Sequence, residues 1–360
     1  MRFTKFITLL LATATLTMGC GNEKPVNPPT GGATLEVDHL SLEVNNPITF
    51  TLIADNGTDI TDQAIIYDKS HDFVEVPNPF TPTADGKYEF YAVAGNIITE
   101  SIFVTVLPSI PELPTDSDEA NTSFKHRILL IDHTGAGCSF CPQMMLALKS
   151  VALTDDYHSK YYEAMSHSYN NNDAAMSPAA FTVSGYYGIN SYPTVTYNFL
   201  YSTTSSFNDA HIMQQIDALW KESADAGIAA SASLATSSVV VNAAVKAAVN
   251  NEYRVTAWLL EDGIYASQTN ATEDWMNTHD NAIRQIASNN PISGIDLGVI
   301  TAGEKKELAM SLEIPTNAKE WNRDNFKVMV IASAKNDNGK FEVANVAICP
   351  VGGSVNYDYK

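Results

Sequence analysis

The chain has 360 residues, of which 45% are apolar, and its formal net charge is −20. This excess of acidic residues argues against direct binding to nucleic acid or adhesion to anionic lipid, because both need clustered Lys and Arg. The length is sufficient for two or three hydrophobic cores.

The N-terminus has the pattern of an export signal. Two basic residues precede an apolar run at 6–18, which is too short to span a bilayer, and Gly19-Cys20 follows it. A small residue directly before a cysteine is typical of a lipoprotein cleavage site, although Thr17 stands where an aliphatic residue is usual. We therefore predict a signal peptide at 1–19 and lipidation of Cys20, which would anchor the protein to a membrane without a transmembrane helix.

Composition divides the remaining chain into a tether, three domains and a linker. Residues 20–33 are rich in Pro and Gly and predict a flexible tether. Period-two alternation over 34–108 predicts an immunoglobulin-like β-sandwich, and the prolines and acids of 109–123 predict a linker that acts as a spacer. Strand and helix patterns alternate over 124–226, which indicates an α/β domain, and strand patterns return over 227–360, which indicates a C-terminal β-sandwich. The expected fold class is therefore multidomain α+β.

Within 124–226 the chain predicts a strand at 127–132, a helix at 139–154, a strand at 161–166 and a helix at 208–224. The long insertion at 168–190 is expected to be irregular. Beyond residue 227 the predicted strands are 237–241, 253–260, 307–314, 326–334 and 341–348.

A Cys-x-x-Cys motif follows the first of these strands. Cys138 would lie at the tip of the following helix and Cys141 one turn further, close enough to form a disulfide. Free backbone N–H groups and the helix dipole stabilise a thiolate at such a position and can lower its pKa to about 3.5–7.5. The motif therefore predicts a redox-active dithiol, and the alternative is a structural disulfide that clips the start of the helix.

Two further residues lie where a thiol-exchange site of the thioredoxin type would need them. Asp132, six positions before Cys138, could take the proton of Cys141 if burial raises the pKa of its carboxyl group. Pro193 stands at the head of a β-rich run, where it removes no ladder hydrogen bond. A cis Tyr192–Pro193 bond would leave the Tyr192 backbone free to pair with an incoming peptide. The candidate catalytic residues are therefore Cys138, Cys141, Asp132 and Pro193. Tyr192 is the candidate substrate-binding residue.

Three stretches of the chain resemble the outer membrane protein 28-related lipoproteins, a family whose core resembles thioredoxin. They are residues 129–142, 187–194 and 274–284. The resemblance implies an envelope lipoprotein with a thioredoxin-like domain at 124–226. It also implies that Cys138 attacks a substrate disulfide and that Cys141 resolves the mixed disulfide.

The motif departs from thioredoxins at three positions. Gly137 replaces the usual tryptophan, and Ser139-Phe140 replaces the central Gly-Pro. Because these neighbours tune the thiolate, the direction of exchange and the substrate stay open.

The main functional prediction is a lipid-anchored outer membrane protein, periplasmic or surface-exposed, that exchanges disulfides with envelope proteins or peptides. The alternative is a non-enzymatic binding or structural lipoprotein with a structural Cys-x-x-Cys. A third hypothesis is a capture protein in which 168–190 forms a lid. No cofactor is expected.

Several other side chains have two interpretations each. His133 or His167 could join the two cysteines in a zinc site, but no second close ligand pair is visible, so no metal is expected. The group His279, Asp280 and Arg284 could bind a ligand or stabilise a loop. Cys349, in an apolar run, is expected to be a buried strand residue without a partner.

Overall fold

The structure is a computed structural model that describes residues 31–360 except 171, 288–293 and 319. Of the described residues, 44% lie in strands and 13% in helices. The chain divides into two compact units. Among the described residues, the first comprises 31–39, Ile48–Phe80 and Tyr88–Phe103, and the second comprises the rest. No helix among the described residues is long and apolar enough to cross a membrane.

The first unit is built from antiparallel strand pairs. In it β1 pairs with β3, β4 pairs with β5 and β6, and β7 pairs with β6. The predicted alternation is present in β6, where Tyr88, Phe90 and Ala92 are buried. The elements are β1 (Ala33–Val37), β3 (Phe50–Ala54), η1 (Thr61–Gln63), β4 (Ile65–Asp68), β5 (Val74–Val76), β6 (Gly86–Ala94) and β7 (Ile97–Ile98). The separate β1–β3 sheet has two strands, fewer than either sheet of an immunoglobulin sandwich.

A mixed nine-stranded sheet forms the centre of the second unit. In spatial order its strands are β12 (Leu200–Thr204), β11 (Thr194–Tyr197), β9 (Ile128–Thr134), β10 (Tyr161–His167), β18 (Ala282–Ile286), β15 (Asn251–Glu261), β21 (Phe326–Lys335) and β22 (Phe341–Pro350), with β19 (Ile295–Ile300) also paired to β15. Strands β9, β10 and β18 run parallel, and the other pairs are antiparallel.

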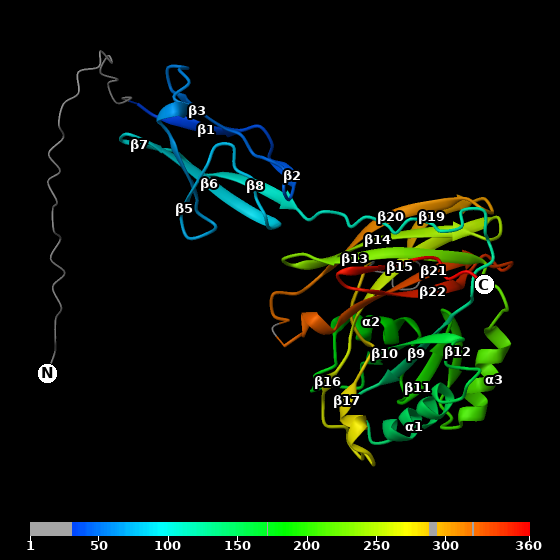
Figure 1. Cartoon of the computed structure of the whole chain (residues 1–360). Coiled ribbons are helices and arrows are strands. Elements are labelled where there is room, and N and C mark those ends of the chain that lie inside the picture. The colour runs from blue at the N-terminus through cyan, green and yellow to red at the C-terminus, as the bar shows by residue number, and fades with distance from the viewer. Residues whose placement is uncertain (1–30, 171, 288–293, 319) are drawn as a thin grey trace, which may run out of the picture. The chain divides into compact units, whose positions relative to one another are not determined.

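Helices cover both faces of the β9–β10–β11 part of this sheet (Figure 1). The apolar side of α1 (Cys141–Ala152) packs on one face together with α3 (Asp209–Leu219), and α2 (Pro178–Tyr186) packs on the other. The Asn208 side chain caps α3 by accepting the His211 N–H. The Ser177 side chain caps α2 in the same way, by accepting the Ala180 N–H.

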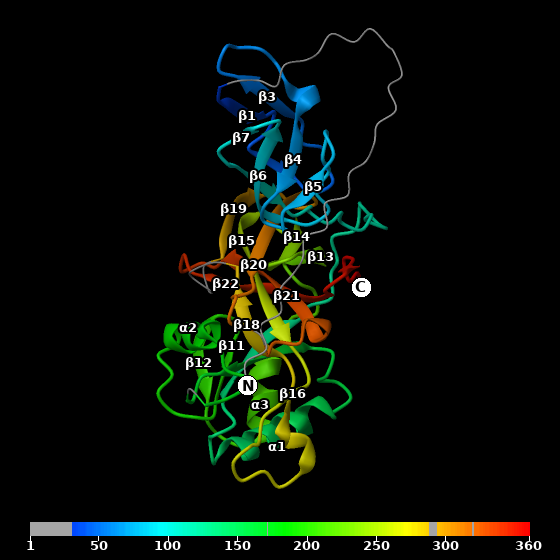
Figure 2. The same ribbon diagram turned by 90° about the vertical axis from the view of Figure 1, so that its left-hand side faces the viewer.

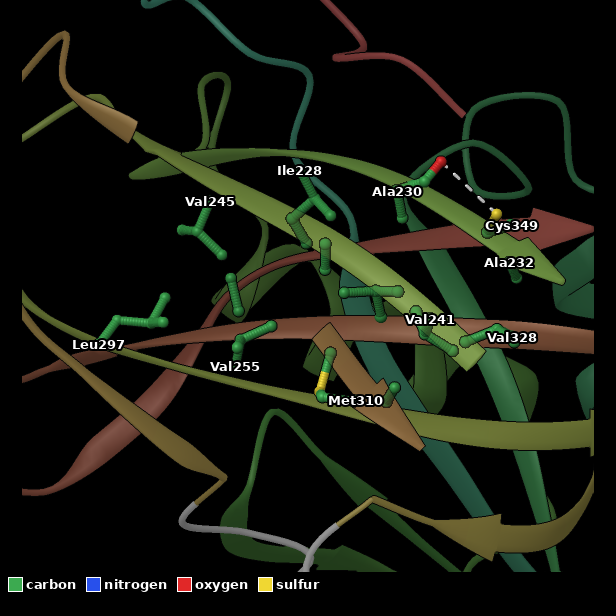
Figure 3. Close-up of a cluster of buried hydrophobic side chains, with 14 of the residues drawn as sticks. Ile228, Ala230, Ala232, Val241, Val245, Val255, Leu297, Met310, Val328 and Cys349 are labelled. Carbon is green, nitrogen blue, oxygen red and sulfur yellow. Dashed lines mark hydrogen bonds between the residues drawn. The ribbon is translucent and has the colours of Figure 1, made fainter. Parts of the chain in front are cut away.

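A second sheet of four strands packs on the β15–β21–β22 part of the nine-stranded sheet. Its strands are β20 (Lys305–Glu313), β14 (Ser238–Ala247), β13 (Ala226–Leu234) and β23 (Gly353–Val355). Ile228, Val241 and Met310 from this sheet meet Val255 and Val328 from the larger one (Figure 3). Figure 2 shows β13 and β14 at the opposite end of the second unit from α1.

Short elements complete the second unit. They are β2 (Ser41–Glu43), which pairs in parallel with β8 (Ile102–Leu107), the hairpin of β16 (Ile264–Tyr265) and β17 (Thr278–His279), and the 3-10 helices η2 (Asp274–Asn277) and η3 (Arg323–Asn325). Cys349 is fully buried in the core between the sheets and is a free cysteine, as expected.

The stretch at 109–123 lies on the four-stranded sheet. Ser231 Oγ donates to a backbone carbonyl of this stretch at 2.6 Å. Lys246, on β14, forms an ion pair with Asp116 at 2.9 Å, and both side chains are buried. Rings of Tyr357 and Tyr359 also lie near the Lys246 ammonium group. These contacts hold the stretch predicted as a spacer against β13 and β14.

The expected fold class, with an immunoglobulin-like sandwich, a thioredoxin-like α/β domain and a C-terminal β-sandwich, is wrong. The protein is mostly β, and one sheet runs through both of the last two predicted regions. The physical reason is β18, which pairs with β10 on one side and β15 on the other. Arg284 lies within β18, so this strand lacks the apolar alternation by which strands are predicted. The residue limits given for the domains stay predictions.

Candidate functional site

The two cysteines of the motif form a disulfide at the start of α1. Their Cα atoms are 5.4 Å apart, and Cys141 is the first residue of the helix. Cys138 is 2% exposed and Cys141 is 0% exposed. The spacing therefore predicted the pairing, and the structure adds that the disulfide is buried.

Pro193 lies at the same edge of the sheet as this disulfide turn. The Tyr192–Pro193 peptide bond is cis, as expected, and β11 begins at the next residue, Thr194. Thr194 pairs with His133 near the end of β9, and the chain leaves β9 directly into the disulfide turn. The topology thus brings Pro193 and the turn to one edge, whereas the exchange chemistry assigned to them stays a prediction.

The Tyr192 side chain is half-buried beside this proline. Its hydroxyl group hydrogen-bonds with Ser168 at 3.1 Å, and its ring meets the Tyr169 ring edge to face at 5.5 Å. These contacts fix the Tyr192 ring, and pairing of its backbone with a peptide stays a prediction.

Asp132 is fully buried on β9. Neither of its carboxylate oxygens has a hydrogen-bond partner among the described residues. Burial raises the pKa of Asp132 well above its ordinary value, and the negative charge of Glu163 on the adjacent strand acts in the same direction. A role for Asp132 in proton transfer stays a prediction.

Glu163 was missed by the sequence analysis. It belongs to β10, and burial raises the pKa of its carboxyl group to about 7. The positive charge of Lys327 opposes this rise, and the negative charge of Asp280 adds to it. The available signal was an acid within the otherwise mainly apolar strand predicted at 161–166.

A loop far along the chain covers the disulfide turn. We call Gln268–Asn270 the strap. The Thr269 N–H donates to the Ala136 carbonyl at 2.7 Å, and Gln268 Nε2 donates to the Cys138 carbonyl at 2.9 Å. Gln268 is itself buried. No sequence motif marked these residues.

Asp173 holds the same turn by a second set of contacts. Its Oδ2 accepts the Ala136 N–H and faces His167 Nδ1, each at 2.7 Å. Burial opposes ionisation of Asp173, but His167 and two backbone N–H groups keep its pKa below the usual range. The His279 ring lies 4.7 Å from the His167 ring, and burial lowers the pKa of His279 to about 4.

The arrangement gives no support to the zinc alternative. Both sulfurs are in the disulfide, and His133 lies between the hydroxyl groups of Ser184 and Thr196. Among the residues that the structure describes, no three His, Cys, Asp or Glu side chains are grouped to hold a metal ion.

The group at 279–284 separates into two parts. Arg284 forms a buried ion pair with Glu261 at 2.7 Å and donates to the carbonyls of Ala174 and Met176, so it stabilises the fold. Asp280 is exposed and lines a pocket. Cys20, the predicted lipidation site, lies outside the described residues.

Comparisons with known proteins give a similar fold and a partial family match. HBP35 of Porphyromonas gingivalis is similar with a TM-score of 0.51 at 15% identity, over 64% of this chain and 76% of that chain. A protein of Agrobacterium tumefaciens, AGR_C_4864, gives a TM-score of 0.42 at 15% identity, over 64% of this chain and 96% of that one. A comparison with curated protein sequences finds no match. Residues 180–354 match the sequence model of the family described as outer membrane protein Omp28.

Proposed function

We propose that this chain is an outer membrane or envelope protein that acts by binding or as a structural component, and that its Cys138–Cys141 disulfide is structural. The family match over 180–354 supports the location. The observation that carries the second part is the burial of the disulfide beneath the strap. An exchange reaction begins with attack of a thiolate on a disulfide sulfur, so access to the sulfur limits its rate.

The reduction potential of the disulfide tests this proposal. The full-length protein in detergent micelles is equilibrated with dithiothreitol or glutathione buffers, and free thiols are trapped and counted. A potential below about −300 mV is expected, because structural disulfides fall in that range. A potential between about −120 and −270 mV would instead place the pair among exchange-competent dithiols and overturn the structural role.

Thiol–disulfide exchange is the second candidate, and Asp132 is the observation that favours it. Asp132 lies on β9, the strand that leads into the disulfide turn, and burial raises the pKa of its carboxyl group, which favours a role as a proton acceptor and donor during exchange. Exchange requires that the strap move away from the turn. Cys141→Ser would then trap a mixed disulfide through Cys138 in envelope extracts, and the absence of any trapped partner would count against exchange.

Anchoring through a lipid on Cys20 belongs to the same proposal. The export pattern at 6–18 and Gly19 before the cysteine support it. Mass spectrometry of the N-terminal peptide of the protein from cell envelopes is expected to show an acylated cysteine. Cys20→Ala should release the protein from the membrane fraction, and retention of this variant would refute the anchor.

A further inference from the structure

A pocket beside α1 has no part in the function proposed above. It has a volume of about 170 Å³, far more than the roughly 15 Å³ that one water molecule needs. The apolar wall of its lining comes from α1 and β10, where Met145, Leu148 and Met165 contribute beside the charged Lys149 and Glu163. The rest of the lining comes from the segment that precedes β18 and includes Trp275 and Asp280.

An ammonium group of the protein already lies at this pocket. Lys149 Nζ is 3.9 Å from the centroid of the Trp275 ring, and both residues line the pocket. Among the described residues Lys149 has no ion-pair partner, so the ring is its charge contact. The face of an indole ring attracts cations through its quadrupole. The protein therefore places a primary ammonium on an alkyl chain against this wall.

Two carboxyl groups of the same pocket lack a cation of their own. Glu163 Oε1 is buried without a hydrogen-bond partner among the described residues, and Glu163 lines the pocket. Asp280 Oδ1 accepts the Gly263 N–H at 2.8 Å, and no ion pair to Asp280 is formed within the described chain. Lys327 acts on Glu163 through its charge, but its ion pair is with Asp262. A buried carboxylate is stabilised by a cation at close range, so an added positive charge would be favourable here.

We propose that this pocket binds an alkylammonium group, with Glu163 and Asp280 facing the nitrogen and Trp275 stacking on it. The apolar wall accommodates the methylene chain, and the bound cation takes the place of Lys149 over the indole ring. This assignment is independent of the role of the disulfide. The same chemistry is offered by a free diamine and by the lysine side chain of a peptide.

Calorimetric titration of the full-length protein in detergent tests the proposal. The probes are 1,5-diaminopentane for a free amine, Nα-acetyl-lysine amide for a peptide lysine, and 1-pentanol as the neutral analogue. The variants are Lys149→Met, which removes the internal competitor, and Glu163→Gln and Asp280→Asn, which remove charge and keep shape. Glu307→Gln, at an exposed ion pair on β20, is the matched control.

Lys149→Met is expected to bind an ammonium probe about tenfold more tightly than the unaltered protein, from the strength of a cation–π contact. Glu163→Gln and Asp280→Asn should each weaken binding, Glu307→Gln should leave it unchanged, and 1-pentanol should not bind. Binding of one ammonium probe in preference to the other identifies the source of the group.

Three outcomes would overturn the proposal. They are equal affinity of the Lys149→Met variant and the unaltered protein, unchanged binding in Glu163→Gln, and equal binding of 1-pentanol. Thermal unfolding of each variant shows that it is folded, and Asp280, an exposed residue, gives a charge-removal test even if Glu163→Gln does not fold.

Discussion

Substitution of Gln268 by alanine is expected to expose the disulfide to reductants without unfolding the protein. Gln268 joins the strap to the turn through its hydrogen bond of 2.9 Å to the Cys138 carbonyl, and it makes a longer contact of 3.5 Å to the Gly135 carbonyl. The Gln268 side chain is 4% exposed, so its loss would remove a donor from the Cys138 and Gly135 carbonyls in a buried environment. The strap would then separate from the turn more often.

The size of the effect follows from the lost contacts. A hydrogen bond of this kind contributes about 1 kcal/mol, and the Cys138 carbonyl would keep only its longer contact of 3.4 Å with the Cys141 N–H. A loss near 1.4 kcal/mol in the local opening equilibrium raises the open population about tenfold. If reduction proceeds only from the open form, the rate of disulfide reduction rises by the same factor.

The assay is the rate of reduction by dithiothreitol under native conditions, followed by thiol trapping and mass spectrometry. The matched control is Asn270→Ala, because Asn270 is exposed and its bond to the Ser139 carbonyl is longer, at 3.3 Å. This control should change the rate less than about twofold, since exposed contacts contribute little. An unchanged rate in Gln268→Ala would show that the strap does not limit access to the sulfurs.

Three further predictions concern stability, each measured by urea denaturation. Cys138→Ala/Cys141→Ala should lose about 2 kcal/mol, the chain-entropy value for so short a loop, and no loss would show that the disulfide does not stabilise the fold. Arg284→Ala should lose about 3–5 kcal/mol because it leaves the Glu261 carboxylate buried and unpaired. Arg284→Ala/Glu261→Ala should lose less, and an equal or greater loss would contradict this explanation. The pKa of Glu163, about 7 in the folded chain against an ordinary 4.5, means that the folded state holds more protons between these values. Stability should therefore fall as pH rises from about 4.5 to 7, by about 3 kcal/mol from this group, and Glu163→Gln should lack that part of the decrease.

Local features of the chain were predictable because their causes are local. The apolar spacing of α1, the Asn208 cap of α3 and the closeness of Cys138 and Cys141 each depend on residues within about two turns of helix. The burial of Asp132 followed from its place in a continuous apolar run. Residues close together in the sequence were therefore sufficient to predict each of these features.

Several elements escaped prediction, and β13, α2 and β18 are three whose sequences lack the usual periodicity. Strand β13 consists mainly of Ala, Gly and Ser, and its burial results from pairing with β14 and β23. Helix α2 contains Gly185 and lies in a stretch expected to be irregular, yet Ser177 and Pro178 begin it with a favourable cap. It packs through Ala179 and Val183 into the core, so the proposed lid at 168–190 contains a core helix.

Strand β18 had the largest consequences for the site. It enters the sheet at Ala282, level with Met165 of β10, which is in turn level with Asp132 of β9. The chain between β15 and β18 passes the turn that follows β9, because Gln268 in this segment donates to the Cys138 carbonyl. The strap and the wall of the pocket that carries Trp275 both belong to that incoming chain. The contact of Gln268 with Cys138 spans 130 residues, and no local pattern encodes such a contact. The pairing of β18 with β10 and β15 thus accounts for both the strap over the disulfide and the pocket beside α1. Arg284 stabilises this strand through its buried ion pair, and the same residue interrupts the apolar alternation by which the strand could have been predicted.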